Sequence, residues 1–469
     1  MFGIETGIFL LLALALFAAF FFEFINGFHD TANAVATVIY TKSLKPLHAV
    51  IFSGALNFLG VLAGGIGVGL SILHLIPVEM ILEQSNLQNL MMVLSILVSA
   101  ILWNLGTWYF GIPSSSSHTL IGAILGVGLG YAFLPGVEHG LDLINYPKIK
   151  SVFSGLLMAP IIGFGLAIFL MKLIAITAKP NSKKELFKSP NENDSPPSWI
   201  RTILIATCGL VSFAHGNNDG QKGIGLVMLI LVCALPHIYA IRADIDPSEL
   251  HRQVESAHKI IRTIDNEALG SKGQVALAQL DKDLMEFEAY EKSGGKDKLA
   301  LRKNIMDISL NTRILLDDPS LPLSTNSKSQ LRAQLAKEES GIRASIDFAP
   351  NWIKLMISLA LGFGTMVGWK RIVVTVGEKI GKSHLNYAQG ASAELVAAAT
   401  VGLASGFGLP VSTTHTLSSG IAGAMVADGG LKNLQYKTIR NIALTWVFTL
   451  PVSMLLSAGL FWLSRYLIQ

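Results

Sequence analysis

The sequence predicts an all-α polytopic membrane protein. We expect two inverted-topology repeats with broken helices, and a small soluble helical insertion in the second repeat. Three observations support this prediction. Of the 469 residues, 51% are hydrophobic and only 14% are charged, whereas an ordinary soluble domain has about 25% charged residues. Two polar motifs each occur twice in the same order. One long polar block interrupts the second copy.

Apolar segments follow one another along the chain and predict ten to twelve membrane spans, since a span needs about 17 to 25 such residues. The segments lie at residues 7–25, 47–73, 90–110, 118–134, 152–176, 200–240, 351–369, 390–407, 413–427 and 439–468. The first segment lacks a basic start and continues into a polar motif. We therefore expect a retained span there and not a cleaved signal peptide.

The first repeated motif carries an aspartate within an apolar segment. Its copies are GFHDTANA at residues 27–34 and GNNDGQKG at residues 216–223. Glycine weakens helices and an ionised aspartate is costly at membrane depth, so we expect each helix to break at this motif. Freed N–H groups would bind an anion, and carbonyls and carboxylates a coupling cation. The alternative is a helix end capped by Asn or Asp at the membrane surface.

The second repeated motif places hydroxyl groups after a proline. Its copies are GIPSSSSHT at residues 111–119 and GLPVSTTHT at residues 408–416. Several hydroxyls near a helix N-terminus suit a tetrahedral oxyanion, whose oxygens each accept more than one hydrogen bond. The alternative is N-capping with close packing of small residues. The candidate residues are Ser115, Ser116, Ser117, Ser412, Thr413 and Thr414, with His118 and His415 ordering the loops.

The two copies are unequally spaced. Asp30 and His118 are 88 residues apart (118 − 30), whereas Asp219 and His415 are 196 apart (415 − 219), so the second repeat carries 108 extra residues (196 − 88). The polar block closely matches this excess, and its apolar residues recur at three- and four-residue spacing, as in packed amphipathic helices. Acids and bases alternate along it, so we expect a solvated helical bundle without chemistry of its own.

A short segment between the repeats is rich in lysine and proline. Its four lysines and four prolines predict a flexible linker on the cytoplasmic side. The predicted domains are membrane repeat 1 at residues 1–178, the linker at 179–198, repeat 2 at 199–241 and 349–469, and the soluble insertion at 242–348.

These doubled motifs, the apolar halves and the polar insertion resemble the inorganic phosphate transporter (PiT) family. Residues 24–40, 103–122, 215–229 and 410–415 are especially similar to bacterial low-affinity phosphate permeases. The resemblance implies a bacterial inner-membrane carrier that moves inorganic phosphate by alternating access. Protons drive the close bacterial relatives and sodium drives others. The bacterial relatives also carry phosphate as a neutral complex with a divalent metal ion.

The resemblance also assigns site residues. Asp30 and Asn33 in the first repeat, and Asn218, Asp219 and Gln221 in the second, match the family's signature positions. It implies no cofactor and no intrinsic metal. We expect inorganic phosphate and the lipid bilayer as partners and no nucleic acid, and a homo-oligomer stays open.

Two positions depart from the pattern. His29 stands where the family has Asn, and Lys222 stands where the first copy has Asn33. Lys222 follows Asp219 by one helical turn, so it is either a structural ion pair or a direct phosphate contact. His29 either carries the coupling proton or is a fixed hydrogen-bonding group.

Two carboxylates lie alone in apolar segments. Glu394 has Leu97 at the matching position of the first repeat (394 − 297), so it is a candidate for proton coupling. Glu23 could instead lie near an interface. The competing functions are a sulfate permease, a membrane phosphatase or phosphotransferase, and a passive channel. The phosphatase would need a nucleophile with a base, or a metal cluster, and the sequence has no HExxH, Walker loop or CxxC motif.

Overall fold

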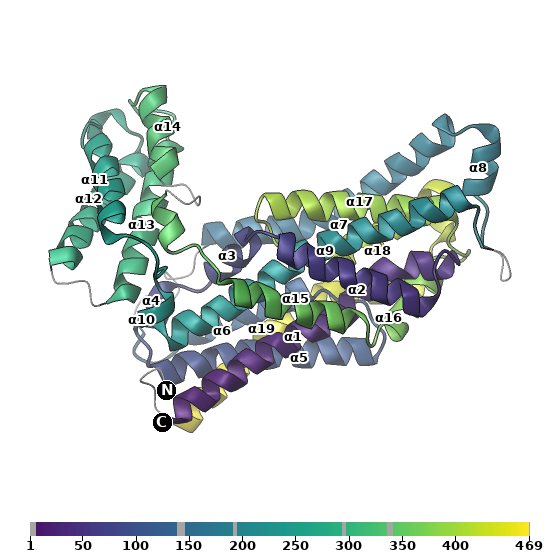
Figure 1. Cartoon of the computed structure of the whole chain (residues 1–469), viewed down its shortest axis with the longest axis horizontal. Coiled ribbons are helices and arrows are strands. Elements are labelled where there is room, and N and C mark those ends of the chain that lie inside the picture. The colour runs from purple at the N-terminus through teal and green to yellow at the C-terminus, as the bar shows by residue number, and fades with distance from the viewer. Residues whose placement is uncertain (1–5, 138–145, 191–194, 293–296, 335–340, 469) are drawn as a thin grey trace. The chain divides into compact units, whose positions relative to one another are not determined.

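The computed structural model describes residues 6–137, 146–190, 195–292, 297–334 and 341–468. These residues form helices and contain no strand beyond one isolated bridge between Gly381 and Leu434, so the predicted all-α class is confirmed (Figure 1). Among them, six helices are long and apolar enough to cross a membrane, or seven if the bent pair α15 (Asn351–Thr365) and α16 (Lys370–Glu378) forms one span. The six are α1 (Thr6–Tyr40), α2 (Pro46–Ala63), α5 (Asn86–Tyr109), α7 (Tyr146–Thr177), α9 (Ser198–Ala234) and α19 (Tyr436–Ile468).

The expectation of ten to twelve spans was therefore too high. Two of the predicted segments form α6 (Ser116–Ala132) and α18 (Thr413–Gly429), each of 17 residues. Each begins inside the protein at a hydroxyl motif, and neither is among the described helices that are long and apolar enough to cross a membrane. A third forms α17 (Tyr387–Gly406), which contains the buried Glu394 and is not among the described helices that are apolar enough to span.

The helices break at the hydroxyl motifs and not at the aspartate motifs, where we expected the breaks. Helices α1 and α9 run uninterrupted through residues 27–34 and 216–223. The motif glycines permit close packing there: a Cβ on Gly27 would lie 2.5 Å from Leu361 O of α15 (Asn351–Thr365). The chain leaves helical geometry instead between α5 and α6 and between α17 and α18. Gly111 and Gly408 have positive φ angles there, 65° and 66°, which glycine adopts without steric cost.

The last long helix of each half packs against helices of the other half. Helix α7 packs against α18 and α17, and helix α19 packs correspondingly against α6 and α5. Both terminal helices contain an internal proline, Pro160 in α7 and Pro451 in α19. Each hydroxyl-motif helix is thus held by the last helix of the other half. This arrangement fits a duplicated architecture, and the inverted orientation of the halves stays a prediction.

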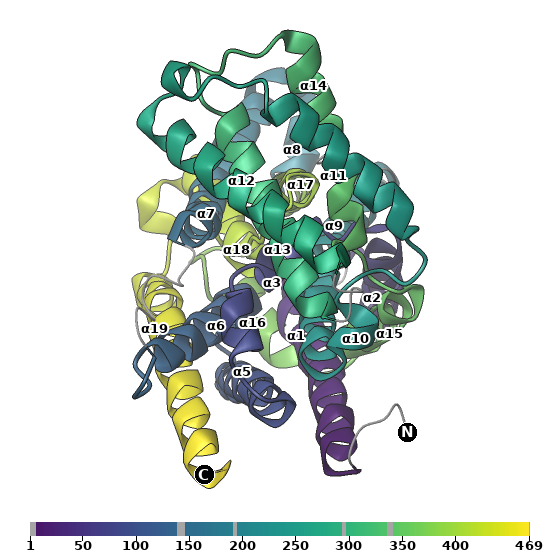
Figure 2. The ribbon, with the colours of Figure 1, turned by 90° about the vertical axis from the view of Figure 1, so that its left-hand side faces the viewer.

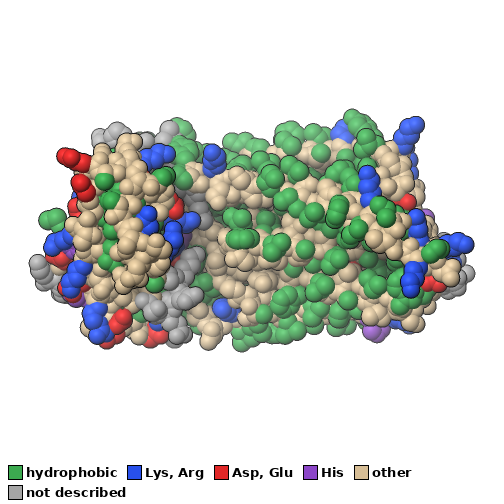
Figure 3. Space-filling model, turned by 90° about the horizontal axis from the view of Figure 1, so that it is seen from above, with side chains coloured by type: hydrophobic (Ala, Val, Ile, Leu, Met, Phe, Trp, Pro, Cys, Tyr) green, Lys and Arg blue, Asp and Glu red, His purple; other side chains and the backbone are tan. Residues whose placement is uncertain are grey.

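The remaining helices of the membrane unit are short. They are α3 (Gly67–Leu73), α8 (Pro180–Leu186), α16 (Lys370–Glu378) and the 3₁₀ turn Leu431–Asn433. Helix α4 covers Val78–Leu82. In Figure 3 hydrophobic side chains cover much of the visible face of the membrane unit, as a bilayer-embedded surface requires.

A second compact unit comprises Leu231–Ala349 together with Ile81–Ser85. Its helices are α10 (Pro236–Tyr239), α11 (Pro247–Ile261), α12 (Ser271–Lys292), α13 (Lys298–Leu316) and α14 (Thr325–Gln334), with 3₁₀ turns at Asn266–Ala268 and Ile342–Ser345. Helices α12 and α13 lie side by side (Figure 2). They bury Leu280, Leu284, Phe287, Ile305 and Ile308 in a core of their own. The three- and four-residue spacing of apolar residues in the sequence therefore corresponds to a core packed between helices.

Candidate functional site

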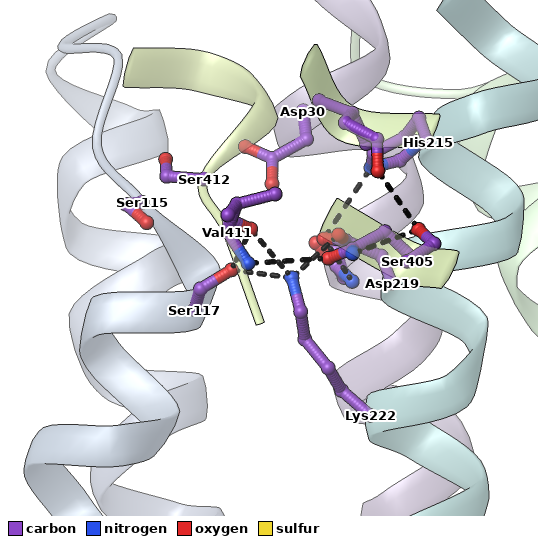
Figure 4. A network of polar contacts seen from close by, with 12 residues as sticks. Asp30, Ser115, Ser117, His215, Asp219, Lys222, Ser405, Val411 and Ser412 are labelled. Carbon is purple, nitrogen blue, oxygen red and sulfur yellow. Dashed lines mark hydrogen bonds and ion pairs between the residues drawn. The ribbon is translucent and has the colours of Figure 1, made fainter. Parts of the chain in front are cut away.

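The two copies of both motifs converge on one buried cluster. Asp30 comes from α1, Asp219 and Lys222 from α9, Ser117 from the first turn of α6, and Thr414 from the first turn of α18. Each of these residues is at most 3% exposed. Figure 4 shows the polar ends of Ser117, Asp219 and Lys222 directed toward one another. Ionisable groups this deeply buried need partners at close range.

Some of those partners come from the opposite half of the chain. The Thr414 hydroxyl donates to Asp30 Oδ1 at 2.5 Å. Lys222 Nζ donates to Asp219 Oδ1 at 2.5 Å, to the Val411 carbonyl at 3.0 Å and to Ser117 Oγ. Each aspartate motif is therefore joined to the hydroxyl motif of the other half.

Further groups surround Asp219. Asn26 Nδ2 donates to Asp219 Oδ2 at 3.3 Å, and His215 Nε2 lies 3.5 Å from the same oxygen. The other ring nitrogen of His215 is 2.9 Å from Asn57 Oδ1, which fixes the orientation of the ring. Asp30, His215 and Asp219 each offer a ligand atom, and these atoms lie within 4.8 Å of one another. Carboxylate and imidazole ligands at this spacing fit a bound cation.

Two other predicted residues lie at the edge of the cluster or outside it. His29 lies 3.3 Å from Asp30 Oδ1 and 3.1 Å from Thr107 Oγ1 through its two ring nitrogens. Asn218 donates to Ser405 Oγ at 2.9 Å and to the Leu409 carbonyl at 3.2 Å, so it holds the loop before α18.

Gln221 points away from the aspartate cluster. It accepts from Val68 N at 2.9 Å and donates to Asn217 Oδ1 at 2.8 Å. The structure therefore does not bring it together with Asp30 and Asp219. Asn33 lies in α1, but its side chain lies outside the described part of the chain.

The hydroxyl residues divide into two kinds. Ser115 and Ser412 cap α6 and α18, accepting from His118 N at 3.2 Å and from His415 N at 3.1 Å. Capping thus accounts for these two. Ser116 Oγ and Thr413 Oγ1, at matching positions of the two motifs, are buried without a hydrogen-bond partner in the part of the chain that the structure describes. A buried polar atom of this kind calls for a ligand or water.

The two histidines of the hydroxyl motifs contact each other. The His118 and His415 rings are 4.3 Å apart, and the His415 ring stacks on Trp446 at 4.0 Å. His118 Nδ1 also lies 2.9 Å from Ser115 Oγ. The pair thereby connects the start of α6 to the start of α18, as a role in ordering these loops requires.

The isolated carboxylates are both fully buried. Glu394 of α17 accepts from Thr37 of α1 and, at 2.5 Å, from Thr207 of α9. Glu23 accepts from Asn26 at 3.2 Å. Its side chain is 0% exposed and is therefore enclosed by protein, and its depth in the membrane stays a prediction.

Sequence reasoning missed four polar residues: Asn26, Asn57, Thr107 and His215. Only His215 carried a signal, because it precedes Asp219 by one helical turn. The other three belong to neither repeated motif.

Comparison with known proteins identifies the family of this chain. A family model described as "Phosphate transporter family" matches residues 26–457. The low-affinity inorganic phosphate transporter PitA of Escherichia coli K12 is 41% identical, over 98% of this chain and 97% of its own length. A probable low-affinity inorganic phosphate transporter of Bacillus subtilis is 29% identical over 96% of both.

A solved structure named "The sodium-dependent phosphate transporter" shares the fold, with a TM-score of 0.57 at 18% identity, covering 98% of this chain and 100% of that one. The relatives are named as transporters, and the apolar helices make this chain a multi-pass membrane protein. The buried cluster lies within the region that the family model covers. The chain belongs to the phosphate transporter family.

Proposed function

We propose that this chain imports inorganic phosphate across the bacterial inner membrane by proton symport. The observation that carries the proposal is the crosswise joining of the motifs, Asp30 with Thr414 and Lys222 with Ser117. A substrate bound at these contacts touches both halves of the chain. Movement of one half relative to the other would then open the site to each side in turn, which is alternating access.

The cluster offers suitable donors to an oxyanion. Ser116 and Thr413 have buried hydroxyls without partners in the described part of the chain, and Lys222 supplies a positive charge. Helices α6 and α18 begin at the same place, and their N-terminal N–H groups add favourable dipoles. Four tetrahedral oxygens have the acceptor capacity to use these donors.

The charges of the cluster support the proposal that a cation accompanies phosphate. Asp30 and Asp219 oppose a single Lys222, so the cluster carries an excess negative charge before an anion arrives. Buried charge without compensation is strongly unfavourable. A proton on His29, which lies 3.3 Å from Asp30, would reduce this excess, and so would a divalent metal ion held by Asp30, His215 and Asp219 and travelling with phosphate as a neutral complex. Glu394 lies outside the cluster and is the second candidate carrier of the coupling proton.

Two alternatives within the same family remain. Sodium could replace the proton, as it does in the structural neighbour, whose name describes a sodium-dependent transporter. Sulfate could replace phosphate, but sulfate at neutral pH carries no proton to donate to a carboxylate such as Asp30. The structure supports phosphate because Asp30 and Asp219 are acceptors at the site.

The test is uptake of labelled phosphate into proteoliposomes under an inward proton gradient without sodium, with and without Mg²⁺ and with excess sulfate. We expect accumulation that a protonophore abolishes and sulfate does not inhibit. Asp30→Asn and Asp219→Asn should each lower uptake at least about tenfold, the effect of about 1.4 kcal/mol. Asp281→Asn, on the exposed surface of α12, is the matched control.

Each other outcome has a definite meaning. Uptake only after sodium is added would show that sodium, and not the proton, is the coupling ion. Strong inhibition by sulfate would favour sulfate as the substrate. Unchanged uptake by both aspartate variants, inserted normally, would show that the cluster is not the transport site.

A further inference from the structure

An open pocket lies at the bend between α15 and α16, outside the buried cluster. The two helices meet at 65°, and the cavity has a volume of about 610 Å³. Its side chains include three cations and three aromatic rings: Lys370, Arg371, Lys379, Trp108, Tyr109 and Phe110. The transport mechanism proposed above uses none of these residues.

The pocket is positively charged. Lys370, Arg371 and Lys379 are exposed, and no acidic residue is among those that line the cavity. The adjacent acid, Glu378, accepts a hydrogen bond from Tyr40 at 2.7 Å. Three like charges around one concavity repel each other and concentrate an attractive field for anions.

Arg371 is held ready for such a ligand. Its NH1 group donates to the Tyr109 carbonyl at 2.6 Å, and its guanidinium carbon lies 5.0 Å from the centres of both the Trp108 and Tyr109 rings. Trp108 is in turn fixed by donating to the Gly368 carbonyl at 2.8 Å. A guanidinium has five donors in a rigid plane and pairs with two oxygens of a phosphate at once. Ring stacking therefore orients the group before any ligand binds.

The pocket also contacts the first hydroxyl motif. Thr375 donates to the Gly111 carbonyl at 2.8 Å, and both residues line the cavity. Gly111 begins the segment that leads through Pro113 to Ser117 of the buried cluster. Gly111 is thus part of both the cavity wall and the first hydroxyl motif.

The pocket lies at the end of the membrane unit where the linker rejoins it. Tyr40 at the end of α1 contacts Glu378 of α16, and Arg201 near the start of α9 donates to the Ser43 carbonyl at 2.9 Å. The basic linker predicts that this end faces the cytoplasm.

We propose that this pocket binds the phosphate oxyanion of a second ligand, either free inorganic phosphate or a phospholipid headgroup. Arg371 pairs with two oxygens, and Lys370 and Lys379 neutralise the remaining charge. This binding does not depend on the buried cluster, so it can hold even where the proposed transport function fails.

The experiment uses the full chain in nanodiscs and has two arms. In the first, binding of labelled inorganic phosphate is measured in phosphatidylcholine discs, in an Asp219→Asn/Lys222→Gln background that removes the positive charge of the buried cluster together with its counter-charge. In the second, retention of phosphatidylglycerol by the unmodified chain is measured by native mass spectrometry. Both arms compare Lys370→Gln/Lys379→Gln and Arg371→Gln with Arg440→Gln, an exposed arginine of α19 outside the cavity.

We expect the pocket variants to weaken the binding of one of the two ligands at least about fivefold. Arg440→Gln should leave that binding unchanged. Loss in the first arm identifies free phosphate, and loss in the second identifies a lipid. Arg371→Gln removes the hydrogen bond to the Tyr109 carbonyl and can disturb the local structure. The Lys370 and Lys379 side chains are exposed, so their double variant tests the pocket without that change. Equal loss with Arg440→Gln, or no loss in either arm, would overturn the proposal.

Discussion

Lys222 joins the two halves of the chain through polar contacts. Its ammonium group bonds to Asp219 of its own helix and to Ser117 and the Val411 carbonyl of the two hydroxyl motifs. The sequence left two interpretations open, an ion pair and a phosphate contact. The structure contains the ion pair, and the contact with Ser117 places the same charge beside the proposed oxyanion site. Both roles can therefore belong to one residue.

Lys222→Gln, alone and combined with Asp219→Asn, tests the ion-pair role of Lys222. The single variant leaves a buried carboxylate without its counter-charge, which costs about 3 to 5 kcal/mol, so the thermal midpoint and phosphate uptake should both fall. The double variant removes both charges and should recover the midpoint without recovering uptake. The measurements are thermal unfolding in detergent and uptake in proteoliposomes. Recovery of uptake in the double variant would show that Lys222 serves only to neutralise Asp219.

Glu394 is expected to carry the coupling proton without contacting phosphate. Its two hydroxyl partners, Thr37 and Thr207, lie on the helices that carry the aspartate motifs, so a change of charge at Glu394 acts on both. Glu394→Gln keeps the shape and removes the charge. We expect phosphate exchange across the membrane to continue while proton-driven accumulation falls at least about tenfold. Glu286→Gln, at an exposed site in α12, is the control, and full accumulation by Glu394→Gln would exclude the coupling role.

At the scale of elements, close backbone packing explains why α1 and α9 do not break. Gly27 of α1 faces α15, and Gly216 of α9 faces Asn57 of α2 in the corresponding way. Propensity alone predicts a weakened helix at glycine, whereas tertiary contact here requires the missing side chain. The position of a break depends on what faces the glycine. That information is absent from a single sequence.

Gly27→Ala tests this explanation. The new Cβ would lie 2.5 Å from Leu361 O and 2.8 Å from Thr365 N, and overpacking of this kind costs about 1 to 3 kcal/mol. We expect a lower thermal midpoint in detergent. Gly106→Ala in α5 is the matched control, because nothing lies within 4 Å of its Cβ position and alanine favours the helix by about 0.5 to 1 kcal/mol. Equal behaviour of the two variants would contradict the packing explanation.

Several features of the fold and site could be predicted because they recur in the chain. The doubled motifs predicted that Asp30, Asp219, Ser117 and Thr414 matter together, and the structure brings them within one cluster. Asn26 and Thr107 could not be predicted, since they reach the cluster only through contacts between helices, Asn26 with Asp219 of α9 and Thr107 of α5 with His29 of α1. The count of spans failed because hydropathy does not distinguish a spanning helix from one that starts inside the protein, such as α6.

At the scale of the whole molecule, the chain comprises two compact units with separate cores. The entry and exit of the second unit lie side by side, since Arg242 N donates to the Ser345 carbonyl at 2.8 Å. Buried Arg302 of α13 donates to the Ala240 and Ile346 carbonyls at 3.0 and 2.9 Å. Burial lowers the pKa of this guanidinium to about 10, which still leaves it charged at neutral pH. The Arg302 side chain therefore links the segment that enters the unit to the segment that leaves it.

This closure predicts that the unit can be removed without loss of transport. Replacement of residues 243–344 by a short Gly-Ser linker joins two points that are already adjacent, and insertions with neighbouring ends are commonly dispensable for the host fold. The buried cluster takes no residue from the segment removed. We expect phosphate uptake per inserted molecule within about twofold of the full chain. Arg302→Gln in the full chain is the companion variant, and it should loosen the unit towards limited proteolysis while uptake continues. A deletion variant that inserts into the membrane and keeps the thermal midpoint of the full chain, but no longer transports phosphate, would assign the unit a part in the transport cycle.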